Sequence, residues 1–337
     1  MTLSAPGLRR TPDPARTPSA PPRRTGLPGL RRRIRKAGWS YAYLAPMAVL
    51  VLVFIVYPIF ASLGYTFYRW NGIGSPTDFV GLANFREVLH DSIFWGAVEH
   101  TFVYAFVLVP VQLLIALMLA LVLNNPRLRF RMFFRTVYFV PVVTSAAVVG
   151  VVMQLMLSNF GDAAGSLLSE TGLTSRHIDW LGDPHTALAV IIGIGIWHTL
   201  GYNLVYFMAG LQTIPAELYE AARIDGAGPV HCFRSITLPM LRPVGVVIVV
   251  LAFIGSFQVF DLVQVLTGGG PYFATEVVNT YIYHLAFGGG SGSGAVQPDV
   301  GLASAASFLY GLLLIVFSAA QVLALRRLGR RRAGAAL

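Results

Sequence analysis

Apolar residues dominate this chain in long runs that contain almost no charge. A helix that spans a bilayer needs roughly 20 apolar residues, and six stretches meet that requirement. None of the six alternates apolar and polar residues with a period of two, so helices are expected rather than the strands of a barrel. The predicted spans are approximately residues 42–66, 101–123, 135–157, 187–210, 243–266 and 302–325.

The composition supports an integral membrane protein. Of the 337 residues, 55% are hydrophobic and only 12% are charged, whereas an ordinary soluble domain carries roughly 25% charged residues. Cys232 is the only cysteine, which excludes a fold stabilised by disulfides within the chain. We therefore expect an all-α polytopic integral membrane protein with six transmembrane helices.

The basic residues predict the orientation of these spans. Six spans place both termini on one side of the membrane, and all but three of the 25 Lys and Arg residues fall on that side. The three exceptions are Arg69, Arg86 and Arg176. The positive-inside rule therefore places both termini in the cytoplasm. The net charge of +10 reflects this asymmetry, and no nucleic-acid partner is expected.

The charge pattern also suggests a domain organisation. Residues 1–38 are rich in Pro and Arg without an apolar period, so we expect a disordered basic cytoplasmic tail that meets membrane lipid. Residues 39–326 form the expected six-helix membrane domain, and residues 327–337 form a second cytoplasmic tail.

The cytoplasmic loop of residues 211–242 has the pattern of ordered structure. Pro215 can begin a helix, and Gly226 with Gly228 can end it. Val230–Thr237 can form a second short turn, and Leu238-Pro239 is expected to break the chain before the fifth span.

The same loop carries a specific motif. Glu220-Ala221-Ala222 is followed after three residues by Gly226 and, after nine more, by Ile236-Thr237-Leu238-Pro239. This resembles the E-A-A signature of ATP-binding-cassette (ABC) importer permeases at every position. Other segments resemble the sugar-permease branch, of maltose and glycerol-3-phosphate type: Trp70-Asn71-Gly72, Phe79–Phe85, Trp180–Pro184 and Gly255–Asp261. The resemblance runs from about Tyr41 to Leu325 and implies a type I ABC importer permease fold.

The resemblance implies a transport subunit rather than an enzyme. Such a subunit forms the translocation path of an ATP-driven, binding-protein-dependent importer, here for a carbohydrate such as a sugar, an oligosaccharide or a related polyol. In these permeases the E-A-A loop forms a coupling helix that docks in a cleft of the ATPase, as a helix in a groove. The residues implied for this role are Glu220, Ala221, Ala222, Gly226, Ile236, Leu238 and Pro239.

The resemblance also implies the partners. They are a second permease subunit in a heterodimer, two ABC ATPase subunits and an extracytoplasmic solute-binding protein, in a bacterial plasma or inner membrane that the chain crosses several times. The partner ATPase would bind ATP and Mg, so no cofactor is expected in this chain, and no nucleotide-binding motif occurs in it.

Polar and aromatic residues inside the spans are the candidates for the solute path. Such residues usually face the interior of a helix bundle, and these supply the hydrogen bonds and aromatic faces that a carbohydrate needs. Those in the fifth span recur every three residues, so we expect them to share one helical face. The candidates are His198, Tyr202, Asn203, Tyr206, Gln258, Asp261 and Gln264. For each, a hydrogen bond between helices remains the alternative role.

Two other functional classes stay open. An ion- or proton-coupled secondary transporter of a small polar solute would use Asp261 and His198 as proton relays. A membrane enzyme would need a catalytic acid cluster or a metal site, and neither pattern is present. His177, Asp179, Asp183 and His185 are close in sequence, but their spacing fits no standard metal site. No catalytic or metal-binding residues are expected.

Overall fold

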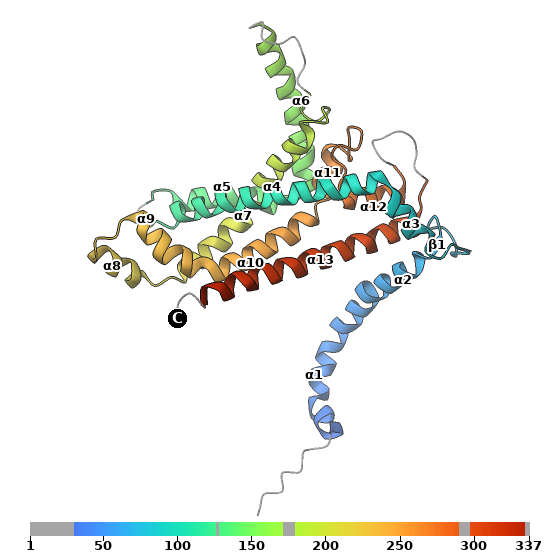
Figure 1. The fold of residues 1–337 in the computed structure, drawn as a ribbon, viewed down its shortest axis with the longest axis horizontal. Helices are drawn as coiled ribbons and strands as arrows, with labels where there is room; N and C mark the ends of the chain where they lie inside the picture. The colour runs from blue at the N-terminus through green and yellow to red at the C-terminus, as the bar shows by residue number, and fades with distance from the viewer. Residues whose placement is uncertain (1–29, 126–127, 171–178, 290–296, 334–337) are drawn as a thin grey trace, which may run out of the picture. The chain divides into compact units, whose positions relative to one another are not determined.

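The computed structural model describes residues 30–125, 128–170, 179–289 and 297–333, and most of these residues are helical (Figure 1). Residues 1–29 of the expected N-terminal tail and residues 334–337 lie outside the described part. Contacts divide the chain into two units, Met1–Pro58 and Ile59–Leu337, which we describe separately.

The first unit is helical throughout its described part. Helix α1 (Leu30–Val51) begins inside the segment 1–38 expected to be disordered, so the helix extends through basic residues before the apolar run starts. A π-helical turn, η1 (Leu52–Val56), follows, and then α2 (Tyr57–Tyr65), which crosses the boundary into the second unit. The segment Tyr41–Tyr65 is long and apolar enough to cross a membrane.

The second unit opens with a short hairpin and a small helix. Strands β1 (Tyr68–Arg69) and β2 (Asp78–Phe79) pair antiparallel, and α3 (Ala83–His90) follows. Helix α4 (Ser92–Leu123) then begins nine residues before the predicted second span. The Asp91 carboxylate fixes this start by accepting a hydrogen bond of 2.8 Å from the Ile93 N–H.

The predicted third span is not one continuous helix. It consists of α5 (Arg131–Val143) and α6 (Ala146–Glu170), which meet at an angle of 99°. The bend arises because Thr144 adopts an extended conformation that ends α5. The described residues therefore contain five candidate membrane spans, or six if this bent pair crosses as one.

The remaining helices include a second broken span. Helix α7 (Ala187–Gln212) is continuous and matches the predicted fourth span closely. The predicted fifth span is split between α10 (Leu238–Phe257) and α11 (Asp261–Leu266). The other elements are α8 (Ala216–Ile224), α9 (Pro229–Cys232), the π-helical turn η2 (Phe233–Thr237), α12 (Val278–Phe287) and α13 (Val300–Ala333).

The expected break at Leu238-Pro239 is absent. The chain stays helical from Pro229 through α10, because the π-helical turn η2 widens the helix just before the proline. Within that turn the Leu238 N–H donates to the Phe233 carbonyl, five residues back. Proline has no N–H and normally clashes with the preceding turn, and the wider turn relieves that clash.

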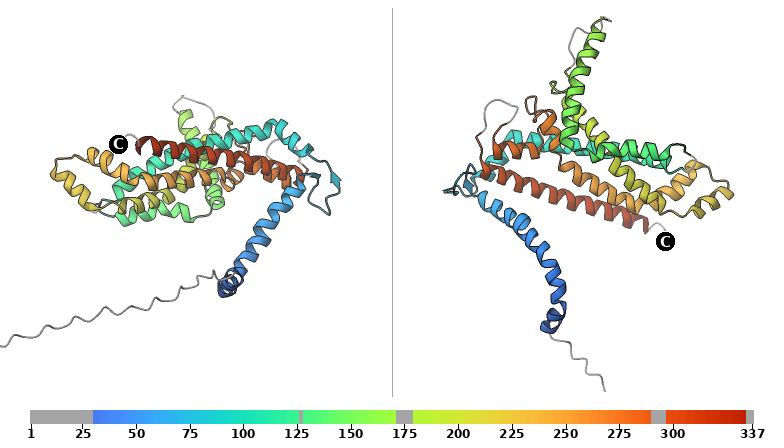
Figure 2. Two further views of the ribbon diagram at one scale, coloured as in Figure 1. Left: turned by 60° about the horizontal axis from the view of Figure 1, so that its bottom comes forward. Right: turned by 180° about the vertical axis from the view of Figure 1, so that it is seen from behind.

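Four long helices, α4, α7, α10 and α13, lie side by side in the second unit (Figures 1 and 2). Helix α4 packs along α7, and α10 packs against both. Close approach is possible because small residues line α7: a Cβ at Gly195, Gly201 or Gly210 would collide with α4, α5 or α10 respectively. Helices α8 and α9 lie at one end of this bundle, and α3 and α12 lie at the other (Figure 1).

The end that carries α12 is fixed by polar contacts to α4. The Tyr281 hydroxyl donates a hydrogen bond of 2.5 Å to the Asp91 carboxylate at the start of α4. Burial raises the pKa of the Tyr281 phenol well above its usual range, and the Asp91 contact raises that pKa further. Tyr281 is thus a neutral donor, and it joins α12 to the N-terminus of α4.

Candidate functional site

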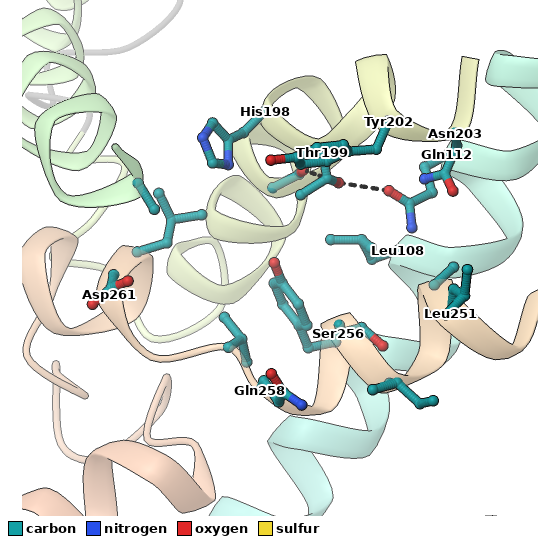
Figure 3. A pocket seen from close by; sticks show the side chains of 18 of the residues that line it. Leu108, Gln112, His198, Thr199, Tyr202, Asn203, Leu251, Ser256, Gln258 and Asp261 are labelled. Atoms are coloured by element: carbon teal, nitrogen blue, oxygen red, sulfur yellow. Dashed lines mark hydrogen bonds between the residues drawn. The ribbon is translucent and has the colours of Figure 1, made fainter. Parts of the chain in front are cut away.

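A cavity of about 460 Å³ opens between α4, α7 and the broken pair α10 and α11 (Figure 3). Its volume falls in the range of roughly 300–1,000 Å³ that is usual for small-molecule sites. Six of the seven candidate solute-path residues line it: His198, Tyr202, Asn203, Tyr206, Gln258 and Asp261. The structure thus brings together residues of two predicted spans.

The fifth-span residues do not share one helical face as expected. Helix α10 ends at Phe257 and α11 begins at Asp261, so Gln258 and Asp261 flank a break (Figure 3). Phe260, with φ −149° and ψ −67°, takes the chain out of the helical path. Gln264 does not line the cavity, and its buried Oε1 has no hydrogen-bond partner among the described residues.

Hydrogen bonds fix the α7 wall of the cavity. The Nε2 atom of His198 lies 3.1 Å from the Thr144 carbonyl, so the imidazole can donate to the bend between α5 and α6. The next residue on α7 is Thr199, whose Oγ1 donates a hydrogen bond of 2.6 Å to Oε1 of Gln112 on α4 (Figure 3). These contacts orient α7 against both of its neighbours.

The cavity offers hydrogen-bonding groups with little charge. Asp261 is the one carboxylate among the described lining residues, and these include no Lys or Arg. Tyr202 and Tyr206 lie one turn apart on α7 and are 49% and 42% exposed, so their ring faces are available to a solute. This arrangement suits an uncharged ligand that carries many hydroxyl groups.

Sequence reasoning missed several cavity residues. Tyr104, Thr199 and Ser256 also line the cavity. Each is a single hydroxyl within an apolar run and shows no periodicity of its own. Thr199 and Ser256 do lie within two residues of predicted candidates, and that proximity is the one signal that could have found them.

The E-A-A loop ends its first helix with a defined capping motif. After α8, the Gly226 N–H donates to the Arg223 carbonyl at 3.1 Å, and the Ala227 N–H donates to the Ala222 carbonyl at 2.8 Å. This is the Schellman pattern, whose turning residue needs a positive φ, and Gly226 has φ +80°. Gly226 therefore reverses the chain between α8 and α9.

The motif residues divide into an exposed group and an anchored one. Glu220 and Ala221 are exposed on α8, and Leu238 and Pro239 are exposed at the start of α10. Ile236 instead packs against the core cluster between α4, α7 and α10. Tyr219 adds a hydrogen bond of 2.9 Å between its hydroxyl and Oγ1 of the buried Thr237. The loop thus presents α8 while its second half is held by the bundle.

Comparison with known proteins places the chain in a family. Residues 112–331 match the family described as "Binding-protein-dependent transport system inner membrane component". The chain belongs to this family. Its members are transport components of the inner membrane rather than enzymes, so the chain is a membrane-embedded permease that works with a solute-binding protein.

Named relatives cover most of this permease. The lactose transport system permease protein LacF of Rhizobium radiobacter is 35% identical over 304 residues, which is 90% of this chain and 98% of LacF. The trehalose/maltose transport system permease protein MalF of Thermococcus litoralis is 33% identical, over 85% of this chain and 93% of MalF. The probable ABC transporter permease protein YurN of Bacillus subtilis is 37% identical, over 73% of this chain and 85% of YurN.

Solved structures share the fold of the permease. A bacterial ABC transporter involved in the import of the acidic polysaccharide alginate contains a chain that matches with a TM-score of 0.72 at 22% identity. The match covers 88% of this permease and 98% of that chain. The same kind of transporter, in complex with an alginate pentasaccharide-bound periplasmic protein, matches with a TM-score of 0.71.

Proposed function

We propose that this permease forms half of the translocation path of an ATP-driven importer for an uncharged carbohydrate. The observation that carries the proposal is the cavity between α4, α7 and the α10–α11 break, in a chain whose relatives are named for lactose, trehalose and maltose transport. The solute would pass along this cavity, in contact with Tyr202, Asn203 and Gln258.

The electrostatics of the cavity support an uncharged solute over an anionic one. A phosphate or a uronic acid would need a fixed cation, and Asp261 would repel it. The described lining residues include no Lys or Arg to balance that repulsion. We therefore propose a neutral sugar or oligosaccharide, even though the structural match is to an importer of an acidic polysaccharide.

The E-A-A loop supports coupling to a separate ATPase. The exposed α8 carries Glu220, Ala221 and Ala222, and small residues let a helix seat closely in a groove. We propose that α8 docks on one of two ABC ATPase subunits, that Gly226 sets its angle, and that a second, different permease subunit completes the path. ATP binding and hydrolysis would then bias the bundle between outward- and inward-facing states.

The proposed topology has six spans with both termini in the cytoplasm of a bacterial cell. The bent pair α5 and α6 would count as one span, which gives an even number of crossings. The strong bias of Lys and Arg toward the termini and toward the loops after the second and fourth spans supports this orientation. In this topology α8 faces the cytoplasm, where ATP is available.

Site-directed labelling tests the proposed path. Since Cys232 is the only cysteine, Cys232→Ser gives a background for single reporters at Tyr202→Cys and Gln258→Cys. In the assembled transporter we expect sugar-loaded binding protein to slow maleimide labelling at both positions. Val247→Cys, exposed on α10 outside the cavity, serves as the control and should label at an unchanged rate. If binding protein loaded with lactose, trehalose or maltose changes the labelling rate at neither Tyr202→Cys nor Gln258→Cys, that result would count against the path.

The secondary transporter remains the alternative function. Its supporting observation is that Asp261 and His198, the proposed relay groups, line the same cavity. It predicts that Asp261→Asn abolishes uptake, whereas the importer reading predicts that uptake survives in this variant.

A further inference from the structure

The break between α10 and α11 leaves three backbone carbonyls, those of Phe257, Gln258 and Val259, without helical partners among the described residues. Among the backbone hydrogen bonds of the described residues, neither the Phe257 nor the Val259 carbonyl accepts one from an N–H group. A continuous helix would pair the Phe257 carbonyl with the Asp261 N–H, four residues on. Unpaired carbonyls are costly at membrane depth, so donors that reach the Phe257 and Val259 carbonyls stabilise the break.

Two side chains from distant elements supply these donors. Nδ2 of Asn279, on α12, lies 3.2 Å from the Phe257 carbonyl and 3.0 Å from the Val259 carbonyl. The Tyr310 hydroxyl, on α13, donates to the Phe257 carbonyl at 2.8 Å. Neither Asn279 nor Tyr310 lines the cavity, so their contacts act on the backbone behind it.

Both donors are held in place by their own surroundings. The Val278 N–H, next to Asn279, donates to Oγ1 of Thr101 on α4 at 3.0 Å. His100, also on α4, has its Nδ1 3.1 Å from the Glu276 carbonyl. Tyr310 is 5% exposed and belongs to the core cluster of α4, α12 and α13. The donors are therefore fixed relative to α4, which forms one wall of the cavity.

We propose that Asn279 and Tyr310 are positioning residues that latch the fifth span in its broken conformation. The break directs Val259 and Phe260 toward the cavity. On a continuous helix Val259 would be turned by about 140° from Ile254, which lines the cavity from the regular part of α10. The role in solute passage rests on the proposed function, whereas the latch rests on the hydrogen bonds alone.

Thiol labelling of the full-length chain in membranes measures the latch directly. In the Cys232→Ser background, Val259→Cys reports on the break and Ile254→Cys reports on the regular part of α10, five residues earlier. Asn279→Leu removes both amide donors at similar size, and Tyr310→Phe removes only a hydroxyl. Tyr283→Phe on α12 is the matched control, because none of the hydrogen bonds described here involves its hydroxyl. The probe is N-ethylmaleimide.

We expect the labelling rate at position 259 to fall by about tenfold in Asn279→Leu and about fivefold in Tyr310→Phe, as each lost bond shifts the balance toward the continuous helix. The rate at position 254 should stay within twofold, and Tyr283→Phe should change neither rate. An unchanged rate at 259 in Tyr310→Phe, or equal changes at 254 and 259, would overturn the latch. Tyr310→Phe decides the matter alone if Asn279→Leu does not fold.

The labelling result is independent of transport. An unchanged rate at position 259 would therefore refute the latch and leave the proposed importer intact. Conversely, a transporter that fails to take up sugar would refute the proposed function, and the labelling data would still stand.

Discussion

At the scale of single residues, Gly269 shows two reasons for a glycine at one position. Its φ is +86°, and a Cβ there would overlap the Glu276 carboxylate. Glu276 is 1% exposed, and its Oε1 lies 3.1 Å from Nδ1 of His284. The sequence marks this segment only as glycine-rich, since the buried carboxylate comes close through the fold of the loop after α11.

Gly269→Ala is therefore expected to lower stability by about 2–4 kcal/mol, from backbone strain together with overpacking. Gly289→Ala is the matched control, because Gly289 has φ +103° and nothing lies within 4 Å of its added Cβ. That control should cost about 1–2 kcal/mol, the backbone part alone. Thermal unfolding in nanodiscs measures both, and equal losses would show that the Glu276 contact does not matter.

At the scale of elements, local signals predicted helices better than they predicted breaks. Pro215 and Gly226 bound α8 as expected, because capping depends on residues within one turn. The break at Gln258–Phe260 could not be predicted, since its donors Asn279 and Tyr310 lie 20 or more residues away. The bend at Thr144 is likewise held from outside, by His198 on α7.

The two π-helical turns each lie just before a proline that the sequence alone would predict to disrupt the helix. In η1 the N–H of Tyr57, the residue before Pro58, donates to the Leu52 carbonyl. In η2 the N–H of Leu238, the residue before Pro239, donates to the Phe233 carbonyl in the same way. The chain therefore stays helical through Pro58 and Pro239, although a proline normally disrupts the preceding turn of a helix. The candidate site was predictable as a set of polar residues, but the cavity depends on breaks that the sequence does not mark.

In the proposed function, α8 transmits the effect of ATP hydrolysis to the membrane helices. The turn at Gly226 ends this helix and sets the direction in which the chain leaves it. Gly226→Ala places a Cβ at a φ of +80°, which strains the Schellman turn by about 1–2 kcal/mol. Gly228→Ala is the matched control, since Gly228 has φ −74° and also has open space. We expect Gly226→Ala to lower sugar uptake per ATP hydrolysed severalfold while the protein still inserts.

The control at Gly228 should keep the wild-type ratio of uptake to hydrolysis. Both quantities are measured on the same proteoliposomes, so that differences in reconstitution cancel. Normal coupling in Gly226→Ala, or equal losses in the two variants, would contradict the role assigned to the turn.

At the scale of the whole molecule, the cavity and the E-A-A loop lie at different places along one bundle of helices in the second unit. The cavity is formed between α4, α7 and the α10–α11 break, and the E-A-A loop lies at the end of the same α7 and α10 (Figure 1). In the proposed mechanism, a movement of α8 would therefore be transmitted to the cavity through α7 and α10, which line the cavity and end at the E-A-A loop. The sequence alone predicted the class of protein, because the motif and the apolar spans are local patterns.

The central claim is that this permease carries a neutral sugar at the expense of ATP. The most direct test is uptake of radiolabelled lactose, trehalose and maltose into proteoliposomes that contain the assembled transporter, with binding protein outside and ATP enclosed. We predict that uptake of at least one of these sugars requires the enclosed ATP and persists when a protonophore is added. Uptake that needs no ATP and collapses with the protonophore would contradict the account.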